Sequence, residues 1–109
     1  YCGKYKESII YLLKIIVKNQ IFYKIGMTVN IEYRCNQLSL KISKVYKTLA
    51  KINVSYFKKM SSWDTYDLEK ELHKEFKDKR VQLNRKFNGY TECFNIVDFS
   101  KFIKIVNNF

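Results

Sequence analysis

Three stretches of the chain carry the hydrophobic pattern of β-strands. Residues 9–17 are rich in Ile, Leu, Val and Tyr and predict a strand that is buried on both faces, and residues 21–25 predict a second strand. The polar residues 18–20 between them predict a turn, so that the two strands form an antiparallel hairpin. Residues 45–56 alternate imperfectly, with lysines between the apolar positions, and predict a long third strand.

Three further stretches have apolar residues at helical spacing. The first follows a candidate cap at Thr28 or Asn30, the second covers about residues 64–78, and the third covers residues 98–107. The apolar stripes of these helices are, in order, Ile31, Cys35, Leu38 and Ile42; Leu68, Leu72 and Phe76; and Phe99, Phe102, Ile103 and Val106.

Shorter segments complete this pattern. Residues 1–8 are polar and are expected to be a lead-in, which leaves residues 9–109 as a single domain, as the chain length favours. Gly26 lacks a Cβ and is expected to let the backbone leave the second strand in a conformation closed to other residues. Residues 79–86 are basic and predict a solvated or phosphate-contacting loop, and residues 91–96 predict a short extended piece. The prediction is an α/β fold, with a three-stranded antiparallel sheet flanked by helices.

The charge balance changes the picture from fold to partner. The chain has 21 basic and 10 acidic residues among 109, which gives a formal net charge of +11. A positive field this strong on a small body favours polyanions, which bind through phosphate contacts and counterion release. The alternative is a lysine-rich surface that reflects only an AT-rich genome. Nine Tyr and eight Phe supply either an aromatic core or a stacking surface.

The cysteines and the longest apolar run bear on location. Cys2, Cys35 and Cys93 are odd in number and lack metal-ligand spacing, so reduced thiols are expected in the cytoplasm, or in the nucleoid or nucleus where the DNA is. Residues 9–17 are interrupted by Lys14 and are too short to cross a membrane, which takes about 20 residues. The chain does not begin with Met, and we expect it to be an excised or processed piece of a longer protein.

Two places in the predicted helices carry chemistry beyond packing. Arg34 lies three residues after Ile31 and four before Leu38, so it is at the edge of a buried stripe and must either extend outward or point at an anion. Glu69 and His73 stand at i and i+4 beside the stripe of the second helix. Plainer interpretations are that Arg34 pairs with a carboxylate and that Glu69 and His73 form a surface pair.

The order strand, strand, helix, strand, helix, with an arginine on the first helix and a glutamate on the second, resembles the GIY-YIG endonuclease superfamily. The similarity covers residues 9–94 and is to the phage-type branch, in which KIG replaces YIG. Tyr11 falls at the tyrosine of GIY, Gly26 at the glycine of YIG, Arg34 at the helix arginine and Glu69 at the metal-binding glutamate.

Two further elements extend the resemblance, and three positions depart from it. The branch has a second helix of the form Glu-x-x-Leu-His-x-x-Phe and a later Gly-Glu-Trp-Phe. The matching residues here are Glu69, Leu72, His73 and Phe76, and then Thr91, Glu92, Cys93 and Phe94. The departures are Ile9 in place of Gly, Lys24 in place of the second tyrosine and Cys93 in place of Trp.

The resemblance implies Mg²⁺-dependent hydrolysis of DNA phosphodiester bonds, with Mn²⁺ expected to substitute. Glu69 would hold the metal, which keeps most of its waters and binds through one or two carboxylates and the substrate phosphate. Arg34 would present its fork to the phosphoryl oxygens. Tyr11 would act as the general base, with Lys24 favouring the phenolate. His73 would orient the glutamate or contact a phosphate.

Several alternatives stay open at this point. Tyr11 could be only a buried strand aromatic and Lys24 only a solvated lysine. A two-residue hairpin loop puts Lys24 on the face of Tyr11, whereas a three-residue loop puts Tyr23 there; the resemblance favours Lys24. Glu92 is a second candidate metal ligand, although pairing with a nearby cation is its simpler role. The competing functions are a basic non-catalytic DNA-binding module and an RNA-binding module that uses tyrosines for stacking. Another domain of a parent chain, or an oligomer, would select the target.

Overall fold

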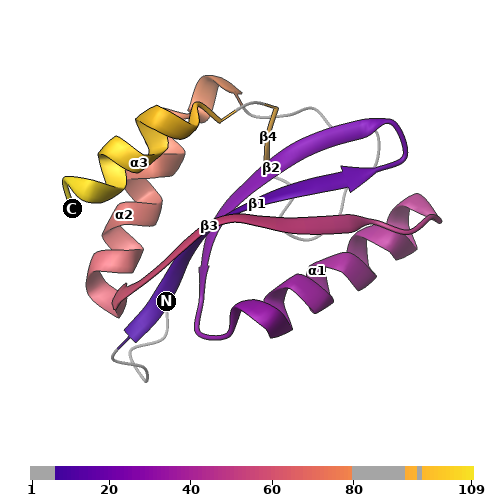
Figure 1. Cartoon of the computed structure of the whole chain (residues 1–109), viewed down its shortest axis with the longest axis horizontal. Helices are drawn as coiled ribbons and strands as arrows, with labels where there is room; N and C mark the ends of the chain where they lie inside the picture. Colours follow the sequence, from indigo (N-terminus) through magenta and orange to yellow (C-terminus); the bar gives the residue numbers. More distant parts are fainter. Residues whose placement is uncertain (1–6, 80–92, 96) are drawn as a thin grey trace.

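A computed structural model of the chain describes residues 7–79, 93–95 and 97–109. Its strands form one antiparallel sheet in the order β3-β1-β2-β4, with helices on both sides (Figure 1). The strands are β1 (Glu7–Val17), β2 (Gln20–Thr28), β3 (Lys51–Ser61) and β4 (Cys93–Phe94). The helices are α1 (Ile31–Tyr46), α2 (Ser62–Glu75) and α3 (Phe99–Asn107), with a short 3-10 turn, η1 (Lys77–Lys79).

The β1–β2 hairpin has the two-residue loop on which the position of Lys24 depends. Val17 pairs with Gln20, so only Lys18 and Asn19 lie in the loop, and Lys18 takes a positive φ of 53°. Both strands are longer than predicted, and β2 runs on through Gly26 to Thr28. β1 is buried along most of its length, because it is a central strand between β2 and β3.

The boundary between α1 and β3 is the main error of the sequence prediction. Val45 and Tyr46 belong to α1 and not to a strand that begins at residue 45, because both continue the apolar stripe of the helix. α1 ends at Tyr46 and is capped by Lys47, which has φ 56° and ψ 36°. β3 begins only at Lys51. Ser39 and Ser43 on α1 bond the backbone of Ala50, which closes the connection.

The predicted sheet also has one strand too few. Cys93 and Phe94 pair with Lys24 and Tyr23, which makes the short extended piece a fourth strand at the β2 edge. A two-residue strand carries too little periodicity to be recognised from sequence. Within the predicted segments 79–86 and 91–96, the basic loop after Lys79 and half of the extended piece lie outside the described residues.

α2 and α3 follow the predicted stripes with small shifts. Ser61 caps α2, which therefore begins at Ser62 and not at residue 64, and Asp98 caps α3. Phe102 and Val106 are buried as expected, whereas Phe99 is 49% exposed. The last turns predicted for α2 form η1 instead.

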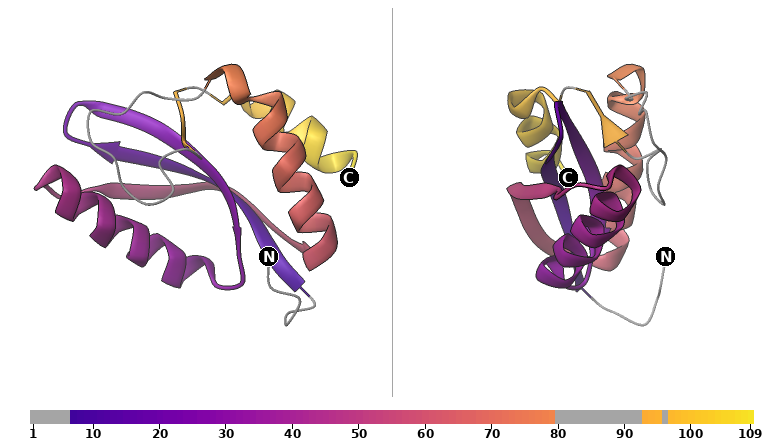
Figure 2. Two further views of the ribbon diagram at one scale, coloured as in Figure 1. Left: turned by 180° about the vertical axis from the view of Figure 1, so that it is seen from behind. Right: turned by 90° about the vertical axis from the view of Figure 1, so that its right-hand side faces the viewer.

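Two hydrophobic cores lie on opposite faces of the sheet. On one face α1 packs against Tyr11, Leu13 and Phe22, and on the other α2 and α3 pack against Ile10, Leu12 and Ile25. The view from behind shows α1 on one side of the strands and the pair α2 and α3 on the other (Figure 2). Because strand side chains alternate, each residue of β1 and β2 belongs to one of these two faces.

The structure bears on the predictions about a membrane span and about the cysteines. No helix in the described ranges is long and apolar enough to cross a membrane. Of the two cysteines in those ranges, Cys35 is partly buried and Cys93 is buried, and neither is in a disulfide.

Candidate functional site

Tyr11 lies directly opposite Gly26 in the hairpin, and its ring covers that glycine. A Cβ on residue 26 would lie 2.7 Å from Cζ of Tyr11 and closer still to its hydroxyl oxygen. The φ of Gly26 lies outside the left-handed region, so the expected escape of the backbone from the strand at this residue is wrong. The glycine is required here for the close approach of the tyrosine ring.

Lys24 lies on the same face of the sheet as Tyr11. It pairs with Leu13, whose side chain packs under α1, and residues that pair directly share a face. Tyr23 packs instead against the core under α2 and α3. The two-residue loop therefore places Lys24, and not Tyr23, on the face of Tyr11. Tyr11 and Lys24 are both buried, with exposed fractions of 0% and 2%, so Lys24 is not the solvated strand lysine of the plainer interpretation.

Arg34 is held on α1 by a short chain of local contacts. Asn30 caps the helix by accepting from the backbone of Tyr33, and the Arg34 amide donates to the Asn30 carbonyl, which begins the helical ladder. The guanidinium Nη1 donates to Oε1 of Gln37 at 3.1 Å, while Nε is buried with no partner among the described residues. Neither Glu32 nor Glu69 forms an ion pair with Arg34 in the described part of the chain, so the simple pairing interpretation does not hold there.

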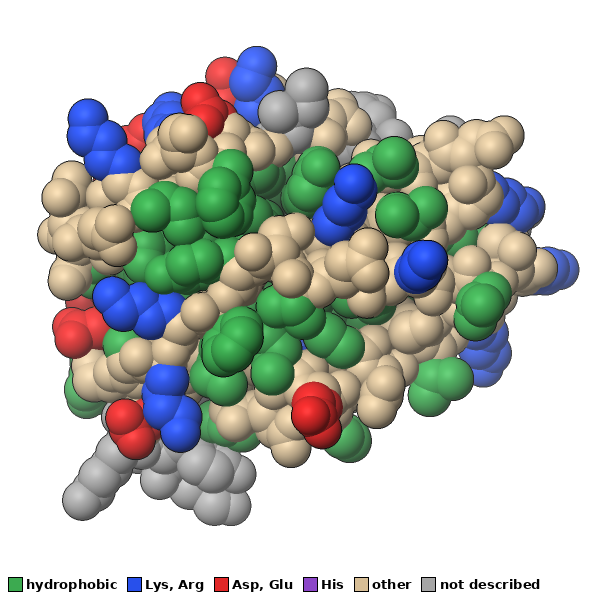
Figure 3. All heavy atoms as spheres, in the orientation of Figure 1, with side chains coloured by type: hydrophobic (Ala, Val, Ile, Leu, Met, Phe, Trp, Pro, Cys, Tyr) green, Lys and Arg blue, Asp and Glu red, His purple; other side chains and the backbone are tan. Residues whose placement is uncertain are grey.

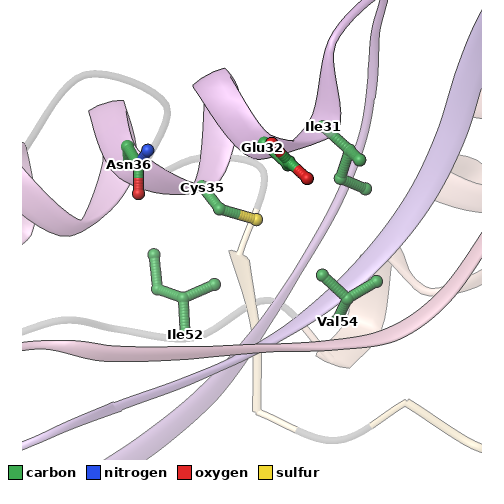
Figure 4. Close-up of a pocket in the computed structure, with 6 residues that line it drawn as sticks. All are labelled: Ile31, Glu32, Cys35, Asn36, Ile52 and Val54. Atoms are coloured by element: carbon green, nitrogen blue, oxygen red, sulfur yellow. The ribbon is translucent and has the colours of Figure 1, made fainter.

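The residues that line a groove between α1 and β3 show how α1 is rotated about its axis. The cavity of about 340 Å³ is lined by residues of both elements, among them Glu32 and Asn36 of α1. Cys35 points from the helix toward Ile52 and Val54 of β3 (Figure 4). Burial raises the pKa of the Cys35 thiol, which favours its neutral form.

The opposite flank of α1 therefore faces β2. Residues 32 and 36, together with Ser39 and Ser43, lie on the β3 side of the apolar stripe. At 100° per residue, Arg34 lies on the other side of that stripe. Because β2 and β3 lie on opposite sides of β1, Arg34 lies on the side of α1 that is turned toward β2.

His73 reaches the same strand from the other face of the sheet. Its Nε2 lies 2.9 Å from the carbonyl oxygen of Ile25, the residue after Lys24. A carbonyl oxygen only accepts, so Nε2 carries the proton. The imidazole also meets the Phe94 ring edge-on, at 5.4 Å between centroids. These contacts tie α2 to β2 beside β4.

Glu69 lies one helical turn before His73, on the same flank of α2. The other flank carries Glu75, which forms an ion pair at 3.5 Å with Lys101 of α3. The flank with Glu69 and His73 thus faces away from α3 and toward the outer edge of β2. Leu68, the preceding residue, is fully buried and fixes the direction of this turn.

The structure does not bring the candidate residues to one face of the sheet, and β2 lies between the two groups. Tyr11 and Lys24 lie under α1, Arg34 lies on the side of α1 that is turned toward β2, and His73 contacts the β2 backbone from the other face. Glu92, the competing metal ligand, lies outside the described residues.

The described residues bear on which kind of metal site is possible. Within the described ranges, no group of three or more His, Cys, Asp or Glu side chains is placed to hold an ion. A cage made only of protein ligands is therefore absent from that part of the chain. A single carboxylate such as Glu69 fits Mg²⁺, because this ion keeps several waters and takes substrate oxygens as ligands.

Sequence reasoning missed two residues that support the candidate site. Gln37 orients Arg34, and its i, i+3 spacing from the arginine was a readable signal. Phe94 packs against His73, but only the folded sheet brings these two rings together, since they are 21 positions apart.

A comparison with protein-family models gives a match over nearly the whole chain. Residues 8–109 match the model of the T5orf172 domain, a phage-derived domain related to GIY-YIG and other endonuclease-like families. No curated protein and no solved structure matches the chain. The family is loosely associated with nucleases. The match spans far more than half of the sequence, and the chain belongs to the T5orf172 domain family.

Proposed function

We propose that this domain is a Mg²⁺-dependent endonuclease that hydrolyses phosphodiester bonds in DNA. The observation that carries the proposal is that Tyr11 and Lys24 share the face of the sheet under α1, while His73 bonds the β2 backbone from the other face. The family's association with nucleases and the net charge of +11 support the same conclusion.

Arg34 is the proposed phosphate-binding group. Its one side-chain partner in the described part of the chain is a neutral amide, so no described carboxylate cancels its charge, and its buried Nε has a donor to offer. A guanidinium held by Gln37 before substrate arrives can stabilise the charge that develops on the phosphoryl oxygens.

Tyr11 is the proposed general base. Its phenolate oxygen would take a proton from the water that attacks phosphorus, while the bond from phosphorus to the leaving oxygen breaks. Lys24 lies on the same face two residues from Gly26, which pairs with Tyr11, and its ammonium would favour the phenolate. Because both side chains are buried here, the proposal includes an opening of this face when DNA binds.

Glu69 is the proposed metal ligand and His73 the residue that positions it. Bound Mg²⁺ would supply charge stabilisation at the phosphate. The bond from His73 Nε2 to Ile25 fixes the α2 flank against β2, so that Glu69 is held relative to Lys24. His73 thereby acts through another residue and does not contact the phosphate with Nε2.

Glu69→Gln tests the proposal directly. The amide keeps the shape but removes the charge that a hard cation requires, so nicking of supercoiled plasmid in Mg²⁺ should be lost while DNA binding persists. Glu75→Gln is the matched control, since Glu75 lies on the other flank of α2 and pairs with Lys101. Equal cleavage by Glu69→Gln and the parent would refute the assignment.

Glu92→Gln completes the test of the metal ligand. The variant should keep clear activity, because its simpler role is to pair with a nearby cation. Loss of cleavage in Glu92→Gln with retention in Glu69→Gln would move the metal site to residue 92. Binding without cleavage by the parent, in Mg²⁺ and in Mn²⁺, would favour the non-catalytic DNA-binding module instead.

A further inference from the structure

The two flanks of α1 differ in charge along the whole helix. The flank that faces β3 carries Glu32, Asn36, Ser39 and Ser43, and the flank that faces β2 carries Arg34, Gln37, Lys41 and Lys44. One flank therefore has no cation and the other has no anion. We call the second flank the α1 ridge, defined by residues 34, 37, 41 and 44.

The spacing of the α1 ridge is that of a continuous helical row. Its members follow at steps of three, four and three residues, which keeps them on one side of the helix. Ten residues at 1.5 Å each give a length of roughly 15 Å. That length corresponds to the rise of about four base pairs at 3.4 Å per step along one strand.

The local contacts leave the ridge able to bind anions. Gln37 uses its amide oxygen to accept from Arg34, so its NH₂ group can donate to a further acceptor. Lys44 is exposed and Lys41 is half-buried, and neither forms an ion pair with a described residue. On the face of the molecule shown in Figure 3, hydrophobic side chains gather across the middle, with charged side chains scattered around them.

We propose that the α1 ridge carries one strand of duplex DNA away from the candidate site, with phosphates on Lys41 and Lys44 and the scissile phosphate at Arg34. Charge complementarity identifies the occupant, since the ridge offers only donors and cations and the DNA backbone offers only acceptors. This inference rests on the DNA-binding part of the proposed function and not on cleavage. It assigns the direction in which the bound duplex extends from the site.

A matched pair of double variants tests the ridge. Lys41→Ala with Lys44→Ala removes two charges from the ridge, and Lys101→Ala with Lys104→Ala removes two from α3, on the other face of the sheet. Both pairs have i, i+3 spacing, and Lys44 and Lys104 both lie in the last turn of their helices, so loss of charge and of helix-dipole pairing is the same.

The measurement is the salt dependence of binding to a short labelled duplex, without Mg²⁺ so that the DNA stays intact. Each lost phosphate contact should flatten the plot of log K against log salt by about 0.9, so the ridge variant should flatten it by about 1.8. The α3 variant should keep the parent slope. Circular dichroism confirms that both variants fold.

Three other outcomes would overturn the proposal. Equal slopes for the two double variants would show that the ridge is only a solvated face. Loss of binding to single-stranded RNA with unchanged duplex binding would assign the ridge to RNA. No salt-dependent DNA binding by the parent would refute the ridge and the proposed function together. Ridge-dependent binding without cleavage would refute only the proposed cleavage and leave the ridge in place.

Discussion

Arg34 is the residue at which the proposed chemistry is most easily tested. Arg34→Ala should lower the cleavage rate by roughly 10²- to 10³-fold, because it removes a preorganised donor to the developing charge. The fold should persist, since the side chain bonds only Gln37 among the described residues. Single-turnover cleavage and circular dichroism give the two readouts.

Arg34→Lys is the control for charge. It keeps the cation but loses the planar fork, so its rate should stay well below that of the parent. If Arg34→Ala cleaves as fast as the parent, the arginine is structural and the phosphate must be bound elsewhere.

Gly26 gives a prediction about stability rather than rate. Gly26→Ala should lower the free energy of unfolding by about 1–3 kcal/mol, because the new methyl group overlaps the Tyr11 ring. Urea unfolding measures the change. In a Tyr11→Leu background the same substitution should cost much less, since the overlapping phenol is gone. Equal costs in the two backgrounds would show that the ring is not what excludes the side chain.

Residue-scale features were predicted where local rules decide them. The edge position of Arg34 follows from spacing along the chain. Spacing left the cap open between Thr28 and Asn30, and the resemblance favoured Lys24 over Tyr23; the structure has Asn30 as the cap and Lys24 on the face of Tyr11. The reason for Gly26 did not follow from spacing, because the overlap is with a residue fifteen positions away across the hairpin. The contact of His73 with Ile25 was hidden for the same reason.

At the scale of the element, the end of α1 shows why the boundary was misplaced. Val45 and Tyr46 suit a strand by composition, but both pack into the core as part of the apolar stripe of α1, and this packing overrides the strand preference. The stop signal was also weak, because Lys47 and not glycine takes the left-handed conformation. β4 failed differently, since pairing with β2 defines it more than its own pattern does.

Lys47→Gly should stabilise the domain by about 0.5–1 kcal/mol. Glycine adopts the observed φ of 56° without the clash of a Cβ, and this gain exceeds its added freedom in the unfolded chain. Lys44→Gly, inside α1, should destabilise by a similar amount. Thermal or urea unfolding of both variants gives the comparison, and shifts of the same sign would contradict the C-cap assignment.

For the whole molecule, the charge of +11 should dominate binding whether or not the enzyme cuts. We expect the affinity for duplex DNA to fall steeply with salt, by a slope of about −0.9 for each phosphate contact. Glu69→Gln should show the same slope as the parent, because it removes no cation. A slope near zero for the parent would rule out the polyanion argument.

The covering of Gly26 by Tyr11 has a consequence for how this sequence can change over evolutionary time. A larger side chain at position 26 has room only after position 11 becomes smaller, whereas a smaller residue at 11 alone opens a void. The two positions should therefore covary among relatives. Residues other than glycine should occur at position 26 in those relatives that lack an aromatic ring at position 11. A set of relatives with an aromatic residue at 11 and varied large residues at 26 would contradict this.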